Sequence, residues 1–232
     1  MKNFVTLIGC AILFAGSSSM AAHASDLNPK SGNAGKFAVG LGVGTTGGTV
    51  EGKYAVSDSL VVRGSLNLLK VSVDDEYDDI DYDAKFDATT FGGFVDFAPF
   101  KNGFVLSGGA YLGDKTLDLD ATPANSVEIG DQTFTPDEVG TLTGKAELNS
   151  FAPYVGIGYD GFMGGSKSWS FNARAGVMFT GSPEVDLVSA NGTLSSDATL
   201  RNEIDAEIQA IEEDADDFKY YPVLTIGIAR RF

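Results

Sequence analysis

Apolar residues alternate with small or polar residues along most of this chain, and this alternation limits the possible folds more than any other feature. In residues 37–44 (FAVGLGVG), Phe37, Val39, Leu41 and Val43 fall on one side, and alanine or glycine on the other. A period of two residues places successive side chains on opposite faces of a β-strand. The pattern recurs in residues 49–56, 60–73, 85–100, 104–119, 145–160, 169–187 and 220–232. The sequence therefore predicts an all-β fold with eight strands.

The connections between these segments indicate how the strands are arranged. One set consists of short turns, at residues 57–59, 101–103 and 161–168. The other set is mostly long and acidic, at residues 74–84, 120–143 and 188–217, with 45–48 as a short exception. Short turns at one end and long loops at the other are typical of bacterial outer-membrane barrels, whose closure leaves no unpaired edge in lipid. We expect an eight-stranded antiparallel transmembrane β-barrel with long acidic extracellular loops, located in the cell outer membrane.

Two of the long connections contain patterns of their own. Residues 127–134 (VEIGDQTF) predict a small hairpin that turns at Gly130-Asp131. Later in the chain, Leu200, Ile204, Ile208 and Ile211 recur at helical spacing and predict a short amphipathic helix. Such a helix either packs on its own loop, lies over the barrel mouth as a lid, or contacts a partner.

The first residues predict a secretory signal peptide. Lys2 precedes a mostly apolar stretch, and Ala22-His23-Ala24 matches the small-x-small cleavage pattern. We therefore expect a signal peptide over residues 1–24 and a single barrel domain over residues 25–232. Residues 7–10 (LIGC) also resemble a lipoprotein cleavage box, although that reading leaves a shorter apolar core.

Composition excludes several function classes. Cleavage after residue 24 removes the only cysteine, Cys10, and the only histidine, His23. The mature chain then lacks the groups for Ser-His-Asp or Cys-His catalysis and for His or Cys metal sites. We expect no enzyme activity, no metal and no cofactor. The 32 acidic residues against 16 basic ones, a formal net charge of −16, also argue against nucleic acid as a partner.

The last segment, residues 220–232 (YYPVLTIGIARRF), is predicted to close the barrel by pairing with residues 37–44. Its apolar row of Leu224, Ile226 and Ile228 would face lipid. A terminal phenylalanine on such a strand, Phe232, looks like an outer-membrane assembly signal, so the assembly machinery is an expected partner. Arg230 falls on the outward row, near enough to the strand end to reach the membrane interface.

The mature chain resembles the CarO-type ornithine-uptake porins of Gram-negative outer membranes. The resemblance lies in GTTGG (44–48), SGGAYLGDKTLDL (107–119), IGDQTF (129–134), FAPYVGIGYD (151–160), FTGSPEVDL (179–187) and the region around RNEIDAE (201–207). It implies a monomeric eight-stranded barrel in outer-membrane lipid that is linked to the entry of small zwitterionic or basic solutes, including ornithine. The RRF ending departs from the more aromatic ending expected of that family.

Charged residues on the polar phase of the predicted strands are the first candidates for a functional site. They are Glu51, Lys53, Arg63, Asp96, Lys115 and Arg174. These side chains form either a charged constriction that selects solutes or a plug of ion pairs, because eight strands leave an interior just wide enough for side chains to fill. The first reading predicts passive diffusion of small basic or zwitterionic solutes such as ornithine. The alternative is a non-conducting structural or surface-interaction barrel with a plugged lumen.

An acidic run in the first long connection, residues 74–84, is the other candidate. It comprises Asp74, Asp75, Glu76, Asp78, Asp79, Asp81 and Asp83. An acidic mouth would concentrate cationic solutes by focusing the electric field. Carboxylates also bind Ca²⁺ or Mg²⁺, as a cation-binding adhesin would require, but the run lacks the glycine and glutamate of an EF-hand loop. The remaining reading is a set of solvated loops that keep the cell surface negative.

Overall fold

Eight strands close into a barrel in the computed structural model, which describes residues 35–77, 80–100, 102–164, 167–215 and 219–232. The predicted signal peptide lies outside the described residues. The barrel strands are β1 (Phe37–Gly44), β2 (Gly47–Ser57), β3 (Leu60–Tyr77), β4 (Ile80–Phe97), β5 (Phe104–Leu112), β10 (Phe151–Asp160), β11 (Trp169–Phe179) and β13 (Tyr220–Arg231).

Pairing between the first and last strands completes the circle. Each barrel strand pairs antiparallel with two neighbours, in the order β1-β2-β3-β4-β5-β10-β11-β13 and back to β1. The closing ladder runs from Ala38↔Arg231 to Gly44↔Thr225. These pairings confirm the predicted eight-stranded antiparallel barrel and the pairing of residues 220–232 with residues 37–44.

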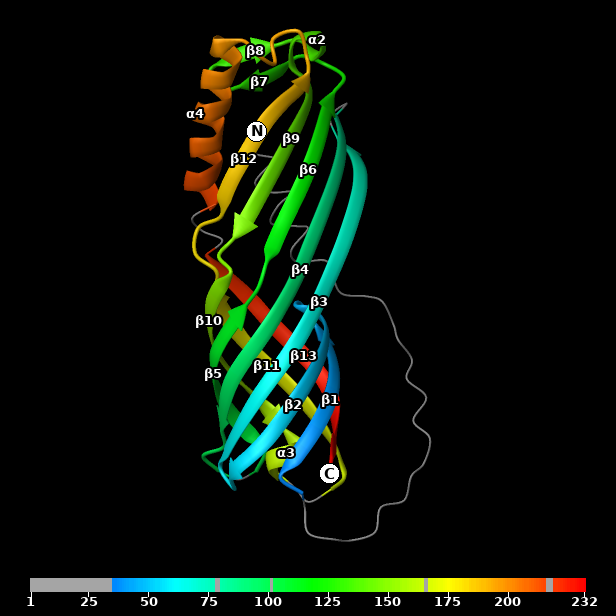
Figure 1. Ribbon diagram of the computed structural model, residues 1–232, viewed down its shortest axis with the longest axis vertical. Coiled ribbons are helices and arrows are strands. Elements are labelled where there is room, and N and C mark those ends of the chain that lie inside the picture. The colour runs from blue at the N-terminus through cyan, green and yellow to red at the C-terminus, as the bar shows by residue number, and fades with distance from the viewer. Residues whose placement is uncertain (1–34, 78–79, 101, 165–166, 216–218) are drawn as a thin grey trace.

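A second sheet stands above one side of the barrel (Figure 1). Strands β6 (Lys115–Pro123), β9 (Gly140–Leu148) and β12 (Glu184–Asn191) join the upper parts of β3 and β4 in the order β12-β9-β6-β4-β3. We call these five strands the extension sheet. Strands β6, β9 and β12 extend into residues 120–143 and 188–217, which were predicted as connections holding only a hairpin and a helix.

The predicted strands 104–119, 145–160 and 169–187 are each two strands separated by a bend. Gly113 and Gly181 adopt φ values of +130° and +72° at two of these bends, where residues with a side chain are strained. The bends are cross-linked, since the Gly113 N–H donates to the Ser150 carbonyl at 2.9 Å. In residues 104–119 the apolar phase changes across the bend, from Leu106 and Leu112 to Leu117 and Leu119.

The prediction of a loop at the acidic segment 74–84 is wrong. Its residues continue β3 and β4 upward as a hairpin, paired from Asp74↔Asp83 to Tyr77↔Ile80. Valine, tyrosine and isoleucine are interspersed among the acids in this stretch and favour strand. The long β3 and β4 therefore connect the barrel to the extension sheet.

A small layer packs on the inner face of the extension sheet. It contains the hairpin β7 (Val127–Ile129) and β8 (Gln132–Phe134), the turn of helix α2 (Pro136–Val139), and helix α4 (Ala198–Asp214). The predicted hairpin is confirmed, with Gly130 at φ +59°. The predicted helix is also confirmed, but its apolar row packs mainly on the other long connection rather than on its own: Leu200 and Ile204 are buried against Ile129 and Phe134. None of the helices in the described ranges has the length and apolar character needed to cross a membrane.

Polarity reverses along β3 where the strand leaves the barrel. In the barrel, Val62 and Leu68 are exposed and Arg63 is buried. Above it, Leu69 is buried and Lys70 is exposed. The outward surface thus changes from apolar to charged within two residues. This change marks the membrane surface, because lipid favours an apolar exterior and water a polar one.

Candidate functional site

The barrel lumen gathers five of the six charged residues that alternation predicted to face inward. They come from β2, β3, β4 and β11, and each is at most 5% exposed: Glu51, Lys53, Arg63, Asp96 and Arg174. Asp160, at the end of β10, joins them and is fully buried. The alternation of β10 already places Asp160 on the lumen side, but its position beside a turn hides it from a search for strand residues.

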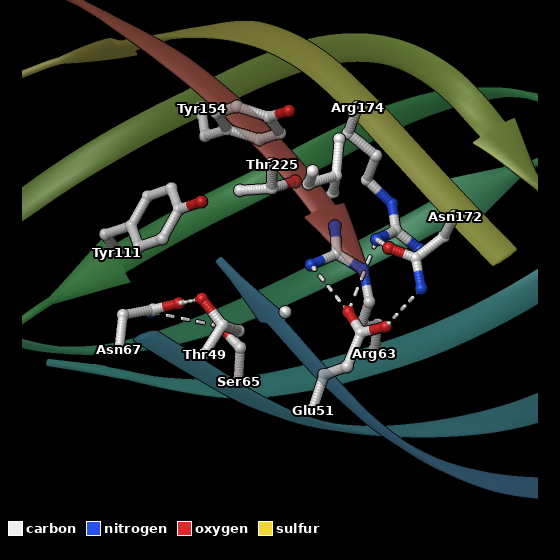
Figure 2. Close-up of a pocket in the computed structure, with 12 residues that line it drawn as sticks. Thr49, Glu51, Arg63, Ser65, Asn67, Tyr111, Tyr154, Asn172, Arg174 and Thr225 are labelled. Carbon is white, nitrogen blue, oxygen red and sulfur yellow. Dashed lines mark hydrogen bonds and ion pairs between the residues drawn. The ribbon is translucent and has the colours of Figure 1, made fainter. Parts of the chain in front are cut away.

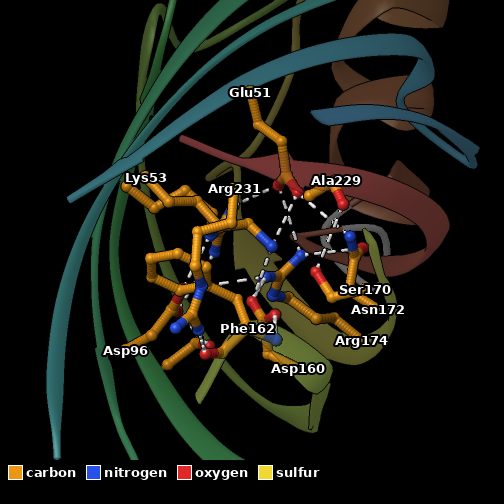
Figure 3. Close-up of polar contacts among 12 residues, drawn as sticks. Glu51, Lys53, Asp96, Asp160, Phe162, Ser170, Asn172, Arg174, Ala229 and Arg231 are labelled. Atoms are coloured by element: carbon orange, nitrogen blue, oxygen red, sulfur yellow. Dashed lines mark hydrogen bonds and ion pairs between the residues drawn. The ribbon is translucent and has the colours of Figure 1, made fainter. Parts of the chain in front are cut away.

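Asp160 is held by two cations from different strands (Figure 3). The Lys53 Nζ lies 2.7 Å from Asp160 Oδ2 and 3.0 Å from Glu51 Oε1. Arg174 donates to the same Asp160 oxygen and lies 3.3 Å from Glu51 Oε2. Asn172 supports this arrangement by donating to Glu51 Oε1 at 3.1 Å. These contacts cross the lumen between β2 and the opposite wall.

Arg63 and Asp96 form the second half of the cluster. The Arg63 Nε and Nη2 donate to the two Asp96 oxygens at 2.8 and 3.3 Å, a bidentate geometry that combines strength with directionality. The Ser107 hydroxyl donates to Asp96 Oδ1 at 2.6 Å. The Arg63 guanidinium also lies 4.0 Å from the centre of the Phe94 ring. Both Asp96 oxygens therefore accept hydrogen bonds.

The cluster is electrically balanced. Each carboxylate lies within 4 Å of at least two cationic groups, and Glu51 also approaches Arg63 at 3.9 Å. Buried charges are tolerated when they are paired in this way, and removal of one partner leaves a strongly disfavoured charge. We call these six residues the lumen network: Glu51, Lys53, Arg63, Asp96, Asp160 and Arg174.

A small polar cavity lies beside the lumen network (Figure 2). Thr49, Ser65, Asn67 and Asn172 contribute hydroxyl or amide groups to its lining. Thr49 donates to Asn67 Oδ1 at 2.9 Å, which fixes part of the wall. The centre of a water-sized sphere can occupy about 10 Å³ within this cavity. This volume is close to the minimum that one water molecule needs.

Aromatic side chains close the lumen toward the extension sheet. The rings of Phe94, Tyr111 and Tyr154 meet edge to face, with centroids 5.0 to 5.6 Å apart. All three are buried in one cluster with Tyr221, whose hydroxyl donates to the Thr45 carbonyl at 2.6 Å. This packing fills the barrel on the extracellular side of the polar cavity.

One helical turn closes the opposite, periplasmic end. Helix α3 (Gly161–Gly164) carries Phe162 back into the barrel, where it is 3% exposed and packs with Val61 and Ala229. The Phe162 N–H donates to Asp160 Oδ1 at 3.0 Å. The Arg231 guanidinium lies 4.2 Å from the centre of the Phe162 ring and donates to the Phe162 carbonyl. The lumen is thus filled at both ends and in the middle.

Lys115, the sixth predicted lumen residue, lies apart from the network. It begins β6, where the chain leaves the barrel, and its Nζ donates to the carbonyls of Gly113 and Asn149 at 2.9 and 2.7 Å. Burial lowers the pKa of the Lys115 amine. Its contacts tie together two of the bends between the barrel and the extension sheet.

The predicted acidic mouth is described only in part. Asp78 and Asp79 lie outside the described residues, and the backbone alone is described for Asp74, Asp75, Glu76 and Asp81. The Asp83 side chain is 44% exposed and pairs with Lys85 at 3.2 Å. Among the described residues, no three histidine, cysteine, aspartate or glutamate side chains converge as a metal site would require.

Several acids of the long connections serve the fold itself. Glu203 accepts from the Asp131 N–H at 3.0 Å, and Glu207 from the Gly130 N–H at 3.2 Å, so helix α4 holds the hairpin turn. Near the start of α2, hydrogen bonds from the backbone and hydroxyl of Thr135 lower the pKa of Glu138. Part of the acidity thus supplies hydrogen-bond acceptors for turns and helix ends.

The carboxyl end lies at the periplasmic rim with its side chain outward. Phe232 is 63% exposed, and its N–H donates to the Phe37 carbonyl at 2.9 Å. Arg230 faces outward as predicted, with its guanidinium 5.3 Å from the Phe232 ring centre and 5.9 Å from that of Trp169. The charge therefore sits among aromatic rings of the kind that line membrane interfaces.

A closed barrel with an apolar exterior and a filled polar interior is an eight-stranded outer-membrane β-barrel, and the protein is located in the outer membrane. No family model and no curated protein matches the sequence. Among solved structures, CarO2 of Acinetobacter baumannii is 21% identical, with a TM-score of 0.58 over 87% of this chain and 100% of that one. CarO of the same organism is 23% identical, with a TM-score of 0.57 over 85% and 98%. The chain therefore shares the CarO fold.

Proposed function

We propose that this protein is a non-conducting outer-membrane barrel that presents its extension sheet at the cell surface for contact with other molecules. The filled lumen is the observation that carries the proposal. The lumen network spans the barrel, and the polar cavity beside it has room for about one water molecule. An amino acid therefore has no path through this arrangement of side chains.

Opening such a path requires the network to separate. A solute that passes between β2 and β11 must part Glu51 from Arg174 or Lys53 from Asp160. Leaving a buried charge without its partner costs about 3–5 kcal/mol. Since about 1.4 kcal/mol is a factor of ten in population, an open state would be roughly a hundred-fold or more rarer than the closed one.

The construction of the extension supports a role at the surface. The extension sheet has its own buried core, built around Ile129, Phe134 and Leu200, rather than a set of loose loops. Its outer face is charged and open to water, whereas its inner face is apolar. A folded layer of this kind holds a defined surface away from the membrane. The proposal includes no catalytic step.

Passive diffusion of small basic or zwitterionic solutes such as ornithine is the second candidate function. It is favoured by the polar lining of the cavity, with Thr49, Ser65 and Asn67 beside the charges of Glu51 and Arg174. The acidic outer surface would attract cationic solutes. This function requires the side chains in the lumen to rearrange during passage.

Liposome swelling on refolded protein separates the two functions. Entry of ornithine, arginine, glutamate and a neutral sugar of similar size would be compared at low and high salt. Heat-modifiable migration on gels would show that the barrel is folded, and an open porin in parallel liposomes would show that the assay responds. We expect no swelling above protein-free liposomes. Faster entry of ornithine and arginine than of glutamate, reduced by salt, would overturn the proposal in favour of the channel.

A further inference from the structure

The extension sheet has two edges, and only one of them is covered by another described element. Strand β12 forms one edge, and helix α4 runs beside it (Figure 1). The Glu212 carboxylate of α4 accepts from the Val185 N–H of β12 at 3.1 Å. An exposed strand edge is a template for pairing with another chain, and proteins commonly cover it. The β12 edge is covered in this way.

The opposite edge is the upper part of β3, which remains open. The pairing of β3 with β2 ends at Leu68↔Gly48, whereas its pairing with β4 continues to Tyr77↔Ile80. From Leu69 upward, β3 therefore has a strand on one side only among the described residues. At about 3.3 Å per residue, this edge is roughly 30 Å long. Every barrel strand below it is paired on both sides.

The backbone direction along this edge can be read from neighbouring residues. A Cβ on Gly47 of β2 would lie 2.1 Å from the Leu68 carbonyl oxygen, so this carbonyl points toward the β2 side. Backbone groups alternate along a strand, so the N–H and C=O of Lys70 and Ser72 also point to that side, where β2 has ended. The groups of Val71 and Val73 point toward β4. Lys70 and Ser72 thus present to an added strand hydrogen-bonding groups that no described strand occupies.

The inner face beside this edge is apolar. Leu69, Phe86 and Leu117 form one buried cluster, with Val71 packed against it, and Val73 farther up the strand is 40% exposed. A strand added to β3 would place every second side chain next to this row. Apolar side chains at those positions would bury surface and contribute to binding.

The outer face of the extension sheet as a whole is acidic, whereas its described side chains nearest the free edge, on β3 and β4, carry equal numbers of lysines and carboxylates. Over the whole face, the described side chains include seven carboxylates and three lysines, aligned across the strands by the register. The carboxylates are Asp83, Asp87, Asp118, Asp120, Glu147, Glu184 and Asp186, and the lysines are Lys70, Lys85 and Lys145. Basic side chains at the outward positions of an added strand would complement this charge.

We propose that the free edge of β3 above the barrel binds an extended segment of a partner protein by β-strand addition, with apolar and basic residues alternating in that segment. Backbone hydrogen bonds would supply affinity, and the two faces would supply selectivity. This inference rests on the proposed role in surface contacts and names the chemistry of the partner.

A second copy of the chain does not fit this edge. Two copies in one membrane both direct β3 away from the cell, so their edges cannot pair antiparallel. A two-fold axis along the membrane normal would set the Ser72 N–H of one copy against the Ser72 N–H of the other. The geometry therefore favours a flexible segment of a different protein over self-association.

Binding of a synthetic peptide to the full-length refolded protein in nanodiscs tests the proposal. The probe is a fluorescent peptide of about nine residues, matched to the edge, that alternates lysine with valine. A second peptide of identical sequence and charge carries N-methyl groups on alternate backbone nitrogens and cannot form the ladder. We expect fluorescence anisotropy to show binding of the first peptide and at least a tenfold weaker affinity for the second. Equal affinity for both, or no binding, would overturn the proposal.

Two variants test whether the peptide binds at this edge. Ser72→Pro removes an N–H that faces the free side and spares the bonds to β4, a position where an edge strand tolerates proline. Ser72→Thr retains the N–H and serves as the matched control. We expect Ser72→Pro to weaken binding at least tenfold and Ser72→Thr to leave it unchanged. Unchanged binding to a Ser72→Pro barrel that migrates as folded would also overturn the proposal. Peptide affinity does not depend on conduction, so this result stands apart from the swelling assay.

Discussion

The barrel and the extension sheet share strands β3 and β4, and the two regions have opposite polarity. Within the barrel, β3 turns Arg63 inward and Val62 outward. Above the membrane it turns Leu69 inward and Lys70 outward. The strand geometry is the same in both regions, and only the surroundings differ. Lipid outside requires charges to be hidden, whereas water outside requires apolar side chains to be hidden.

The ion pairs of the two regions differ for the same reason. Lys53 and Asp160 meet in the lumen with side chains that are fully buried. Lys70 and Asp87 meet on the extension with side chains that are 80% and 53% exposed. Water competes for the exposed pair and not for the buried one. The comparison predicts that equivalent substitutions have unequal effects in the two regions.

The largest effect is expected from Asp160→Ala. The substitution leaves Lys53 and Arg174 without their shared carboxylate inside the barrel. We expect a loss of about 3–5 kcal/mol in the free energy of unfolding, measured by urea titration of the protein folded in lipid vesicles. Asp83→Ala, which removes an exposed partner of Lys85, is the control. A loss below about 1 kcal/mol for Asp160→Ala would contradict this prediction, because it would show that water screens the lumen network as it screens exposed ion pairs.

Leu200→Ala tests whether the extension has a core of its own. Leu200 is fully buried among Ile129, Phe134 and Ile204. Removal of a buried leucine side chain typically costs about 2–5 kcal/mol. We expect faster amide exchange in α4, β7 and β8, with heat-modifiable migration of the barrel unchanged. Gln209→Ala, on the exposed face of α4, should leave exchange as it is. Exchange that rises equally in the barrel strands would show a single cooperative unit.

Acidification should loosen the extension before the barrel. Hydrogen bonds from Thr135 lower the pKa of Glu138, and those from Thr199 lower the pKa of Asp197. A carboxylate with a lowered pKa stabilises the fold above its ordinary pKa, here 4.5 and 3.8. That contribution is lost as the pH falls through the lowered values. Amide exchange at the first turns of α2 and α4, corrected for its intrinsic pH dependence, should stay constant from pH 7 to 4.5 and then rise. A rise that begins well above 4.5 would contradict this assignment.

The smallest effect is expected from Lys70→Ala. Its partner Asp87 is exposed, and exposed pairs contribute about 0–1 kcal/mol. We expect the free energy of unfolding to fall by an amount within this range, and the loss to become smaller at high salt. The double variant with Asp87→Ala gives the coupling energy of the pair directly. A coupling as large as that of Lys53 with Asp160 would remove the distinction between the two regions.

The alternation of side chains between the two faces of each strand explains how much of this molecule could be predicted from its sequence. Alternation predicted that Glu51, Lys53 and Arg63 face inward, because the face on which a strand residue lies depends only on local sequence. It did not pair Lys53 with Asp160, since the two are 107 residues apart and meet only when the barrel closes. It also placed Lys115 in the lumen, because the two-residue count from Tyr111 was carried through the bend at Gly113. The bend itself depends on contacts with other strands.

The polarity reversal left a trace in the sequence. Leu68 and Leu69 are adjacent apolar residues, and they interrupt the alternation at the level where β3 leaves the barrel. Below the doublet the apolar phase faces lipid, and above it the apolar phase faces the core of the extension. A doublet alone does not mark the boundary, since Val61 and Val62 are also adjacent within the barrel. The acidity of residues 74–84 obscured it by suggesting a loop.

Single-channel recording in planar lipid bilayers tests the central claim most directly. The wild-type protein would be compared with a variant that removes two charges of each sign from the lumen, Glu51→Ser, Arg63→Ser, Asp96→Ser and Arg174→Ser. Both would first be shown to insert as folded barrels. The filled lumen predicts no conductance steps for the wild type and clear steps for the variant. Wild-type steps as large as those of the variant would contradict the account.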